Sequence, residues 1–157
     1  MLDQVQKPTR YTGGEMNTQL KPWDSAKLHF AFCFPDTYEV GMSHLGMKIL
    51  YAAMNQQPDM LCERAFMPWV DMMDLMKQEK VPLFTLESRS PLSAFDVVGF
   101  TLQYEMSYSN ILAMLELGGI PLLRENRREE DPIVVAGGPC AFNPEPLADF
   151  IDAFMVG

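Results

Sequence analysis

The chain has 157 residues and a formal net charge of −9, because 21 aspartates and glutamates outnumber 12 lysines and arginines. Hydrophobic residues make up 48% of it, an ordinary globular composition that excludes a disordered or collagen-like chain. The acidic balance argues against nucleic-acid partners, since phosphate binding needs clustered Lys and Arg. No apolar run approaches the ~20 residues that span a bilayer, so no membrane partner is expected.

Cysteine usage bears on the cellular compartment. Cys33, Cys62 and Cys140 are far apart and odd in number, so they match neither a zinc site nor a disulfide framework. The polar N-terminus does not resemble a signal peptide. We therefore expect three small buried thiols, no metal site and a cytoplasmic location.

The chain divides into a short arm and one domain. Residues 1–24 carry little hydrophobic periodicity and predict an irregular N-terminal arm, with a surface turn at Gly13-Gly14. The domain is expected over 25–157.

The domain opens with a strand and a helix. Residues 28–34 form an apolar run that ends at a proline, which predicts a strand buried on both faces. Ser43 is placed to cap a helix over 45–54. That helix is apolar nearly all round, so it should be buried on more than one side. Residues 61–67 read more weakly as the second strand.

A second helix follows Pro68, which suits a first helical turn. Its apolar residues recur at helical spacing and predict a core-facing stripe: Trp69, Met72, Met73 and Met76. Residues 81–86 are a possible extra strand, which Pro82 would confine to a sheet edge.

The next strand–helix pair occupies 95–102 and 109–117. The helix should stop at Gly118-Gly119, because glycine adopts the conformations that end helices. Residues 120–123 are a candidate short strand.

The last part repeats the alternation of strand and helix. Residues 133–136 are short, β-branched and uncharged, as in a central strand. Asn143 is expected to cap a helix, and 153–156 to form the final strand. The repeated alternation predicts a parallel α/β sheet with helices on both faces.

Ligands of open parallel sheets bind beyond the carboxyl ends of the strands. Three loops end there and combine glycines with polar groups, namely 35–46, 103–110 and 137–146. The expected cofactor-binding residues are Gly41, Met42, Ser43, His44, Gln103, Tyr104, Glu105, Gly137, Gly138 and Pro139.

No catalytic signature accompanies these loops. No Lys-Ser or Lys-Thr follows Gly137-Gly138-Pro139, so it is not a P-loop, and no nucleophile elbow or metalloprotease motif is present. Three carboxylates could gather near the ligand edge for acid–base chemistry, but no spacing rule requires it: Asp36, Glu39 and Glu105. The fragment itself reads as a non-catalytic binding or docking module.

Four segments resemble one family. They are Tyr11-Thr12-Gly13-Gly14-Glu15, the stretch from Pro35 to Gly46, the stretch from Phe95 to Glu105, and Val135-Ala136-Gly137-Gly138-Pro139-Cys140-Ala141. Together they resemble the cobalamin-binding-like domain that precedes the core of radical S-adenosylmethionine (SAM) proteins. The resemblance implies a three-layer, flavodoxin-like or Rossmann-like sheet of order 2-1-3-4-5 with an extra edge element.

The resemblance also implies a C-terminal radical SAM domain in the same chain, which would hold a [4Fe–4S] cluster and SAM. The cluster motif C-x-x-x-C-x-x-C is absent from these 157 residues. The sequence is then a front piece of an iron–sulfur, oxidoreductase-type enzyme, truncated before its core. Either helix 45–54 or helix 69–76 is expected to expose an apolar face to that core.

Cobalamin is the possible cofactor of the fragment, and the sequence leaves two readings of it open. Domains that ligate cobalt through histidine carry D-x-H-x-x-G, whereas here Met42 replaces the aspartate and one residue fewer separates His44 from Gly46. Either cobalamin binds without a histidine ligand, or the domain only docks. The alternatives from other classes are a stand-alone flavodoxin-like flavin or nucleotide domain, with phosphate donors near Ser43, and a pure interaction domain.

Overall fold

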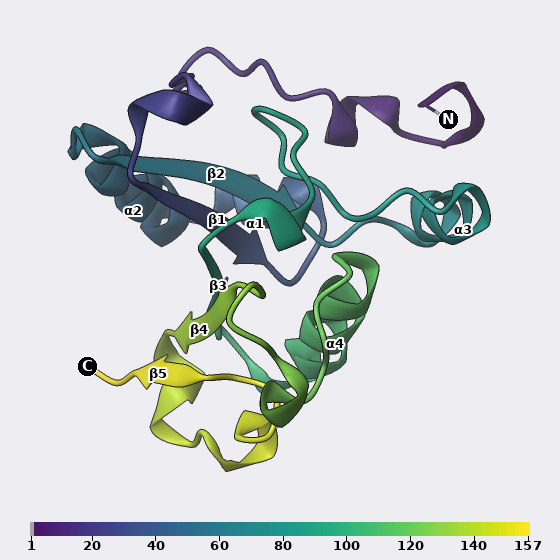
Figure 1. The fold of residues 1–157 in the computed structure, drawn as a ribbon. Coiled ribbons are helices and arrows are strands. Elements are labelled where there is room, and N and C mark those ends of the chain that lie inside the picture. The colour runs from purple at the N-terminus through teal and green to yellow at the C-terminus, as the bar shows by residue number, and fades with distance from the viewer. Residues whose placement is uncertain (1) are drawn as a thin grey trace.

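The computed structural model describes residues 2–157 (Figure 1). Five parallel strands form one sheet in the order β2-β1-β3-β4-β5. The strands are β1 (Leu28–Phe34), β2 (Met60–Phe66), β3 (Val97–Thr101), β4 (Ile133–Gly137) and β5 (Ala153–Met155). The predicted α/β class, parallel direction and strand order are confirmed.

The helices lie in two layers. They are α1 (Tyr38–Ser43), α2 (Leu45–Gln56), α3 (Val70–Glu79) and α4 (Tyr108–Leu117). Figure 1 shows α2 beside one face of the sheet and α3 and α4 beside the other. Because crossovers between parallel strands are right-handed, the β1–β2 connection and the connections that run toward β5 cover opposite faces.

Each face has its own hydrophobic core. Alternate strand residues point to opposite faces, so Phe32 packs under α2 while Cys33 packs under α3 and α4. Met72 and Met76 of α3 are each 1% exposed, which confirms that the methionine stripe fills the core. Cys33 and Cys62 are buried as expected, whereas Cys140 is only partly buried.

The junction between α1 and α2 differs from the prediction. The stretch after β1 forms its own short helix, and His44 rather than Ser43 caps α2, with Nδ1 accepting the Met47 backbone N–H at 3.1 Å. The Ser43 hydroxyl instead donates to the Val40 carbonyl at 2.7 Å, inside α1. Ser43 is the last residue of α1 and its side chain is turned back toward Val40, so the next residue, His44, takes the cap position of α2.

The predicted two-sided burial of the first helix is wrong. Only Met47, Tyr51 and Asn55 of α2 are buried. Leu45, Ile49 and Leu50 are 68%, 57% and 52% exposed, because the helix touches the rest of the described chain along one stripe.

The extra edge element exists without being a strand. Residues 81–86 make one antiparallel bridge, Phe84 to Pro91, and the Leu86 N–H donates to the Arg64 carbonyl of β2 at 2.8 Å. Glu87 then accepts the Arg64 N–H at 2.7 Å. A loop and a carboxylate thus satisfy part of the free edge of β2, which would otherwise expose unpaired backbone groups.

Three further local predictions are corrected. Residues 120–123 form no strand, and α3 begins at Val70, two residues after Pro68. Asn143 caps no α-helix; the stretch contains only the 3-10 turns Pro139–Phe142 and Glu145–Leu147. Three prolines within eight residues leave too few N–H donors for a regular helix there.

The stop of α4 is as predicted. Gly119 has φ +72°, its N–H donates to Glu116, and the Ile120 N–H donates to Leu115. This paired arrangement satisfies two of the carbonyls that a helix C-terminus leaves free.

Among residues 2–157, no helix is both long enough and apolar enough to cross a bilayer.

Candidate functional site

The first two predicted loops meet where the chain leaves β1 and β3. The Asn110 side chain donates to the Pro35 carbonyl at 2.9 Å, and the Tyr104 hydroxyl donates to the Asp36 carboxylate at 3.4 Å. β1 and β3 are neighbours whose connections leave in opposite directions, so these contacts bridge the switch point of the sheet.

The second and third loops are joined through backbone. The Leu102 N–H donates to the Gly137 carbonyl at 2.7 Å, and the Leu102 carbonyl accepts the Cys140 N–H at 3.1 Å. Gly138 has φ +117°, and a Cβ there would lie 2.8 Å from the Leu102 carbonyl oxygen. Glycine is therefore required where the third loop crosses the second. We call the three adjoining loops the rim.

The structure separates the predicted site residues into two places. Six lie in the second and third loops of the rim: Gln103, Tyr104, Glu105, Gly137, Gly138 and Pro139. Gly41 and Met42 instead line a hollow beneath the N-terminal arm. Ser43 and His44 sit at the α1–α2 junction, where both make helix-end contacts.

Three large apolar side chains of the rim are exposed, among polar residues such as Glu105 and Asn143. Met106 is 82% exposed, Phe142 72% and Tyr104 45%. Beside them, burial and the charge of Glu105 raise the pKa of the Cys140 thiol, so it stays protonated rather than becoming a nucleophile.

A buried ion network, which the sequence reading missed, holds the arm to the sheet. Arg64 of β2 pairs with Glu87 at 2.6 Å and with Glu15 of the arm at 2.8 Å. Its guanidinium lies 4.7 Å from the centre of the Tyr51 ring, and the Tyr38 hydroxyl donates to Glu15 at 2.8 Å. The glutamate of Tyr11-Thr12-Gly13-Gly14-Glu15 is thus an anchor and not part of a surface turn.

The pKa shifts in this network follow from burial and charge. Burial raises the pKa of Glu87, and Arg64 offsets only part of that effect. Burial alone would also raise the pKa of Glu15, but the Tyr38 hydrogen bond and the Arg64 charge lower it overall. The pKa of Tyr38 rises to about 12, chiefly through burial and then through its bond to Glu15.

The network borders the hollow beneath the arm. This space has a volume of about 570 Å³, and its polar wall is built by Glu15, Asn17, Gln19, Lys48, Tyr51 and Arg64. The polar groups that surround Arg64 already bond to one another, because Tyr51 accepts the Gln19 N–H at 2.7 Å. Three of the polar side chains that line the hollow, Glu15, Tyr51 and Arg64, are therefore already hydrogen-bonded to other protein groups.

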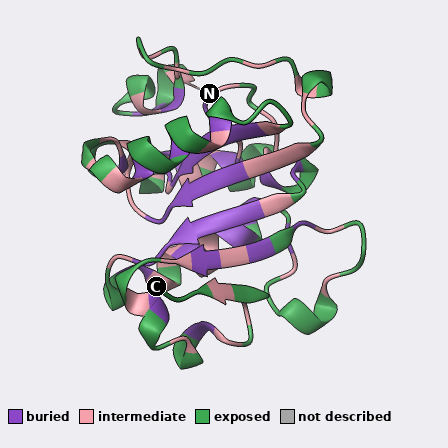
Figure 2. Ribbon diagram, turned by 90° about the vertical axis from the view of Figure 1, so that its left-hand side faces the viewer, coloured by how far each residue is buried: buried purple, intermediate pink, exposed green. Residues whose placement is uncertain are grey.

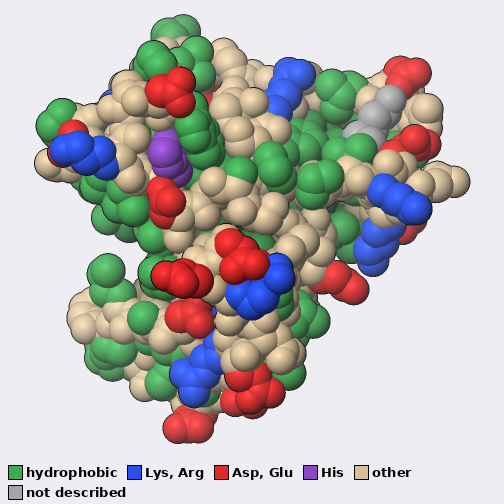
Figure 3. Space-filling model, viewed as in Figure 1, with side chains coloured by type: hydrophobic (Ala, Val, Ile, Leu, Met, Phe, Trp, Pro, Cys, Tyr) green, Lys and Arg blue, Asp and Glu red, His purple; other side chains and the backbone are tan. Residues whose placement is uncertain are grey.

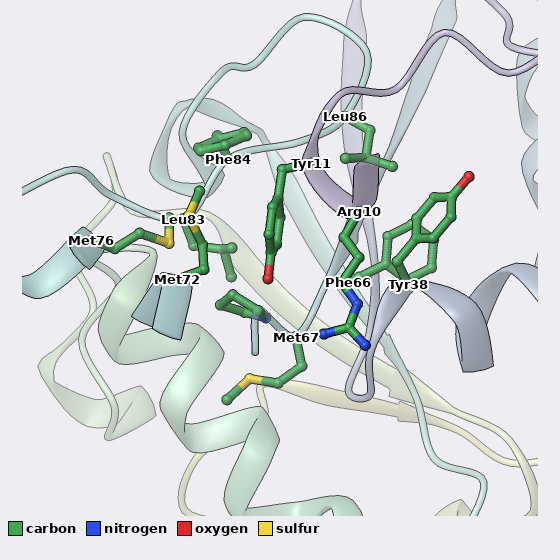
Figure 4. A pocket seen from close by; sticks show the side chains of 11 residues that line it. Arg10, Tyr11, Tyr38, Phe66, Met67, Met72, Met76, Leu83, Phe84 and Leu86 are labelled. Atoms are coloured by element: carbon green, nitrogen blue, oxygen red, sulfur yellow. The ribbon is translucent and has the colours of Figure 1, made fainter. Parts of the chain in front are cut away.

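A second anchor fixes the start of the arm. Figure 4 shows Tyr11 inserted between Leu83 and Met72 on one side and Arg10 on the other. The Tyr11 hydroxyl accepts the Trp69 N–H at 3.1 Å. The space left beside it is about 20 Å³, room for one water at most.

His44 does not fit the role of a cobalt ligand. Its Nδ1 accepts the Met47 N–H, which places the proton of the neutral ring on Nε2. A metal-bound imidazole needs a free lone pair on that nitrogen and a partner that accepts from the other. The same capping bond occupies the Met47 N–H that a flavin phosphate would use at the start of α2.

Surface charge and metal-ligand geometry add little to the site. On the face shown in Figure 3, Lys and Arg side chains are scattered among acidic and apolar ones. Across residues 2–157, no three His, Cys, Asp or Glu side chains gather as a metal site would require.

The glycine of α1 provides a test of the predicted ligand contact. A Cβ at Gly41 would overlap the Phe66 ring and lie 3.1 Å from Phe34. We expect Gly41→Ala to lower the free energy of unfolding by about 1–3 kcal/mol, because the core cannot take the extra methyl group. Urea unfolding measures this, and Phe66→Leu in the same chain should recover part of the loss. An unchanged midpoint for Gly41→Ala would contradict a packing role.

Comparison with known proteins agrees with these features. Residues 46–157 match the family described as radical SAM proteins, N-terminal. Over 128 residues the chain is 29% identical to Uncharacterized protein MJ0966 of Methanocaldococcus jannaschii, covering 81% of this chain and 23% of that protein. The chain thus spans about a quarter of the relative's length. No solved structure matches significantly. The family match covers most of the sheet, and the chain belongs to the N-terminal domain family of radical SAM proteins.

Proposed function

We propose that this chain is a non-catalytic module that docks through its rim on a radical SAM catalytic domain of the same polypeptide. That domain would supply the [4Fe–4S] cluster and SAM, and the chemistry would take place there. The family match supports a module of this kind, and the length of the relative leaves room for a much larger catalytic part.

The observation that carries this proposal is the exposure of three large apolar side chains of the rim. Tyr104, Met106 and Phe142 come from two loops that backbone hydrogen bonds hold together. Large apolar side chains that are grouped on one edge and left in water typically mark a protein contact. Aromatic residues and methionine are also the types enriched at such contacts.

Docking accounts for the rim better than cobalamin binding does. The contacts of Tyr104 with Asp36 and of Asn110 with Pro35 occupy the switch point where a cofactor would enter the sheet edge. His44 is committed to capping α2. Both observations favour a sheet edge that contacts another protein domain over one that holds a cofactor.

A binding experiment tests the proposal. We expect Met106→Asp combined with Phe142→Asp to weaken binding to the separately purified catalytic domain by more than tenfold in Kd. Each side chain buries apolar surface worth about 1.5–3 kcal/mol, and every 1.4 kcal/mol is tenfold. Isothermal titration calorimetry measures the constant.

The matched control is Met16→Asp, which changes a fully exposed methionine on the arm. It should leave the Kd within about twofold. Equal affinities for the rim variant and the control would rule out docking through the rim. Visible-spectrum titration of the same proteins with cobalamin tests the competing assignment.

A further inference from the structure

One face of the sheet is covered only in part. On the side where α2 packs, the strand residues of β4 and β5 point into solvent: Ile133 is 56% exposed and Met155 78%. Their neighbours Val134 and Ala136 face the opposite side and are buried. Figure 2 shows this side, with α2 in front of one part of the sheet and the strands toward the C-terminus uncovered. We call the uncovered part the open face.

A parallel sheet is normally buried on both faces, so we expect another segment or molecule to pack on the open face. No connection between the strands can supply it. The right-handed β1–β2 crossover places α2 over β1 and β2, and every later crossover lies on the opposite face. Only a segment before β1, a segment after β5 or another molecule can reach the open face.

The segment before β1 is already committed elsewhere. Its Glu15 pairs with Arg64 of β2, and its Tyr11 bonds to the backbone just before α3. Both contacts lie at the β2 end of the sheet, four strands away from β5.

One flank of α2 borders the open face. Lys48 and Ala52 of α2 line the hollow beneath the arm, so Leu50 and Met54 lie on the opposite flank of this helix. Met54 and Phe30 of β1 both pack against the core cluster beneath α2, and the Phe30 ring lies over Gly99 of β3. Leu50, 52% exposed, therefore borders the uncovered strands. The open face is thus bordered on one side by α2 and consists otherwise of uncovered strands.

We infer that the open face is the seat of an amphipathic helix formed by the segment that follows β5 in the longer polypeptide. This inference rests on the proposed function, which makes the chain the front module of a larger protein. The β5 strand ends at Met155, on the edge of the open face itself. A loop of 2–6 residues followed by a helix of 10–14 residues is long enough to run back across the strands.

The residues of the open face predict which residues the covering helix should carry. The open face and its border are aliphatic: Leu50, Val97, Ile133, Val135, Ala153 and Met155. The segment should therefore carry apolar residues at i, i+3, i+4 and i+7, packed between α2 and β5, with polar residues on its outer side.

Methionine oxidation by hydrogen peroxide, read by peptide mass spectrometry, tests the inference. In the 157-residue chain, the three most exposed methionines among residues 2–157 should oxidise at similar rates: Met16 on the arm, Met106 on the rim and Met155 on the open face. In the full-length protein we expect Met155 to react at least tenfold more slowly, while Met16 stays reactive. Protection of Met106 reports separately on docking through the rim.

A length series identifies the cover. A version that ends roughly 20 residues after Gly157 should already protect Met155 without the catalytic domain. Protection that appears only with the catalytic domain, or that rises with protein concentration as in a dimer, would overturn the assignment to this segment. Equal reactivity of Met155 and Met16 at every length would show that no helix covers the open face. Protection of Met106 in the same experiment would still support docking through the rim.

Discussion

Arg64→Ala should be among the most destabilising single substitutions in this chain. The side chains of Arg64 and Glu87 are 7% and 1% exposed, and the substitution leaves Glu87 as a buried charge without a cation. Removing one partner of a buried ion pair typically costs about 3–5 kcal/mol. We expect urea unfolding at about pH 7 to show a loss of this size, together with weaker attachment of the part of the arm around Glu15.

The loss should depend on pH. Burial already raises the pKa of Glu87, and without Arg64 that pKa rises further. When the pKa of a carboxyl is higher in the folded chain than in the unfolded chain, the group stabilises the fold fully below its unfolded pKa. That contribution is lost as the pH rises through its folded pKa. The gap between wild type and Arg64→Ala should therefore narrow on acidification toward pH 4.5, the unfolded value of glutamate. A gap that widens in acid would contradict a buried charge as the cause.

The matched control removes both charges. Arg64→Met with Glu87→Met should recover most of the stability lost by Arg64→Ala, because well-packed apolar residues often replace a buried ion pair at little cost. A double-mutant cycle over the two positions gives the coupling energy. A double variant as unstable as Arg64→Ala would show that the arm contacts, and not the buried carboxylate, account for the loss.

Gly138→Ala should destabilise the chain by about 2–4 kcal/mol. At φ +117° and ψ −176°, Gly138 has a backbone conformation that is nearly restricted to glycine and costs other residues about 1–3 kcal/mol. The new Cβ would also press on the Leu102 backbone, which lies at 2.8 Å and directly precedes the neighbouring loop. Because backbone cannot rotate away as a side chain can, the clash adds to the strain.

The adjacent glycine is the control. At Gly137 a Cβ would meet the Met155 Cβ at 3.4 Å and the Met155 carbonyl oxygen at 3.6 Å, which are ordinary contacts, and the φ of Gly137 is not positive. Gly137→Ala should therefore cost less than about 1 kcal/mol. Thermal unfolding of the two variants side by side measures the difference. Equal melting temperatures would mean that the crossing of the two rim loops does not need glycine.

The strands were predictable from local sequence. The runs at 28–34 and 133–136 are apolar and bounded by proline, charge or glycine, and they lie within one residue of β1 and β4. Burial on both faces imposes that pattern on the residues of the strand itself. The two weakest predicted strands, 81–86 and 120–123, did not form, since Leu83, Leu86 and Ile120 are buried in the core without pairing as strands.

The site was predictable only as a set of loops. Parallel strand order brings the carboxyl ends of β1, β3 and β4 to one edge, and the rim contacts of Tyr104, Asn110 and Leu102 lie there. What individual residues do was predictable only in part. The cap by His44 reaches Met47, three residues along the chain, and is a local contact that a helix-start histidine can make. Gly41 packs against Phe66 of β2, a partner that only the fold brings to it.

The sequence by itself determined the class of the domain, since hydrophobic patterning and turn residues act within a few positions of one another. Only the tertiary structure decided that Glu15, Arg64 and Glu87 would share one buried network, because up to 49 residues separate the paired side chains and no spacing records such a contact. The bare side of β4 and β5 was decided in the same way. It follows from strand order and crossover handedness, which are properties of the assembled sheet and not of any segment within it.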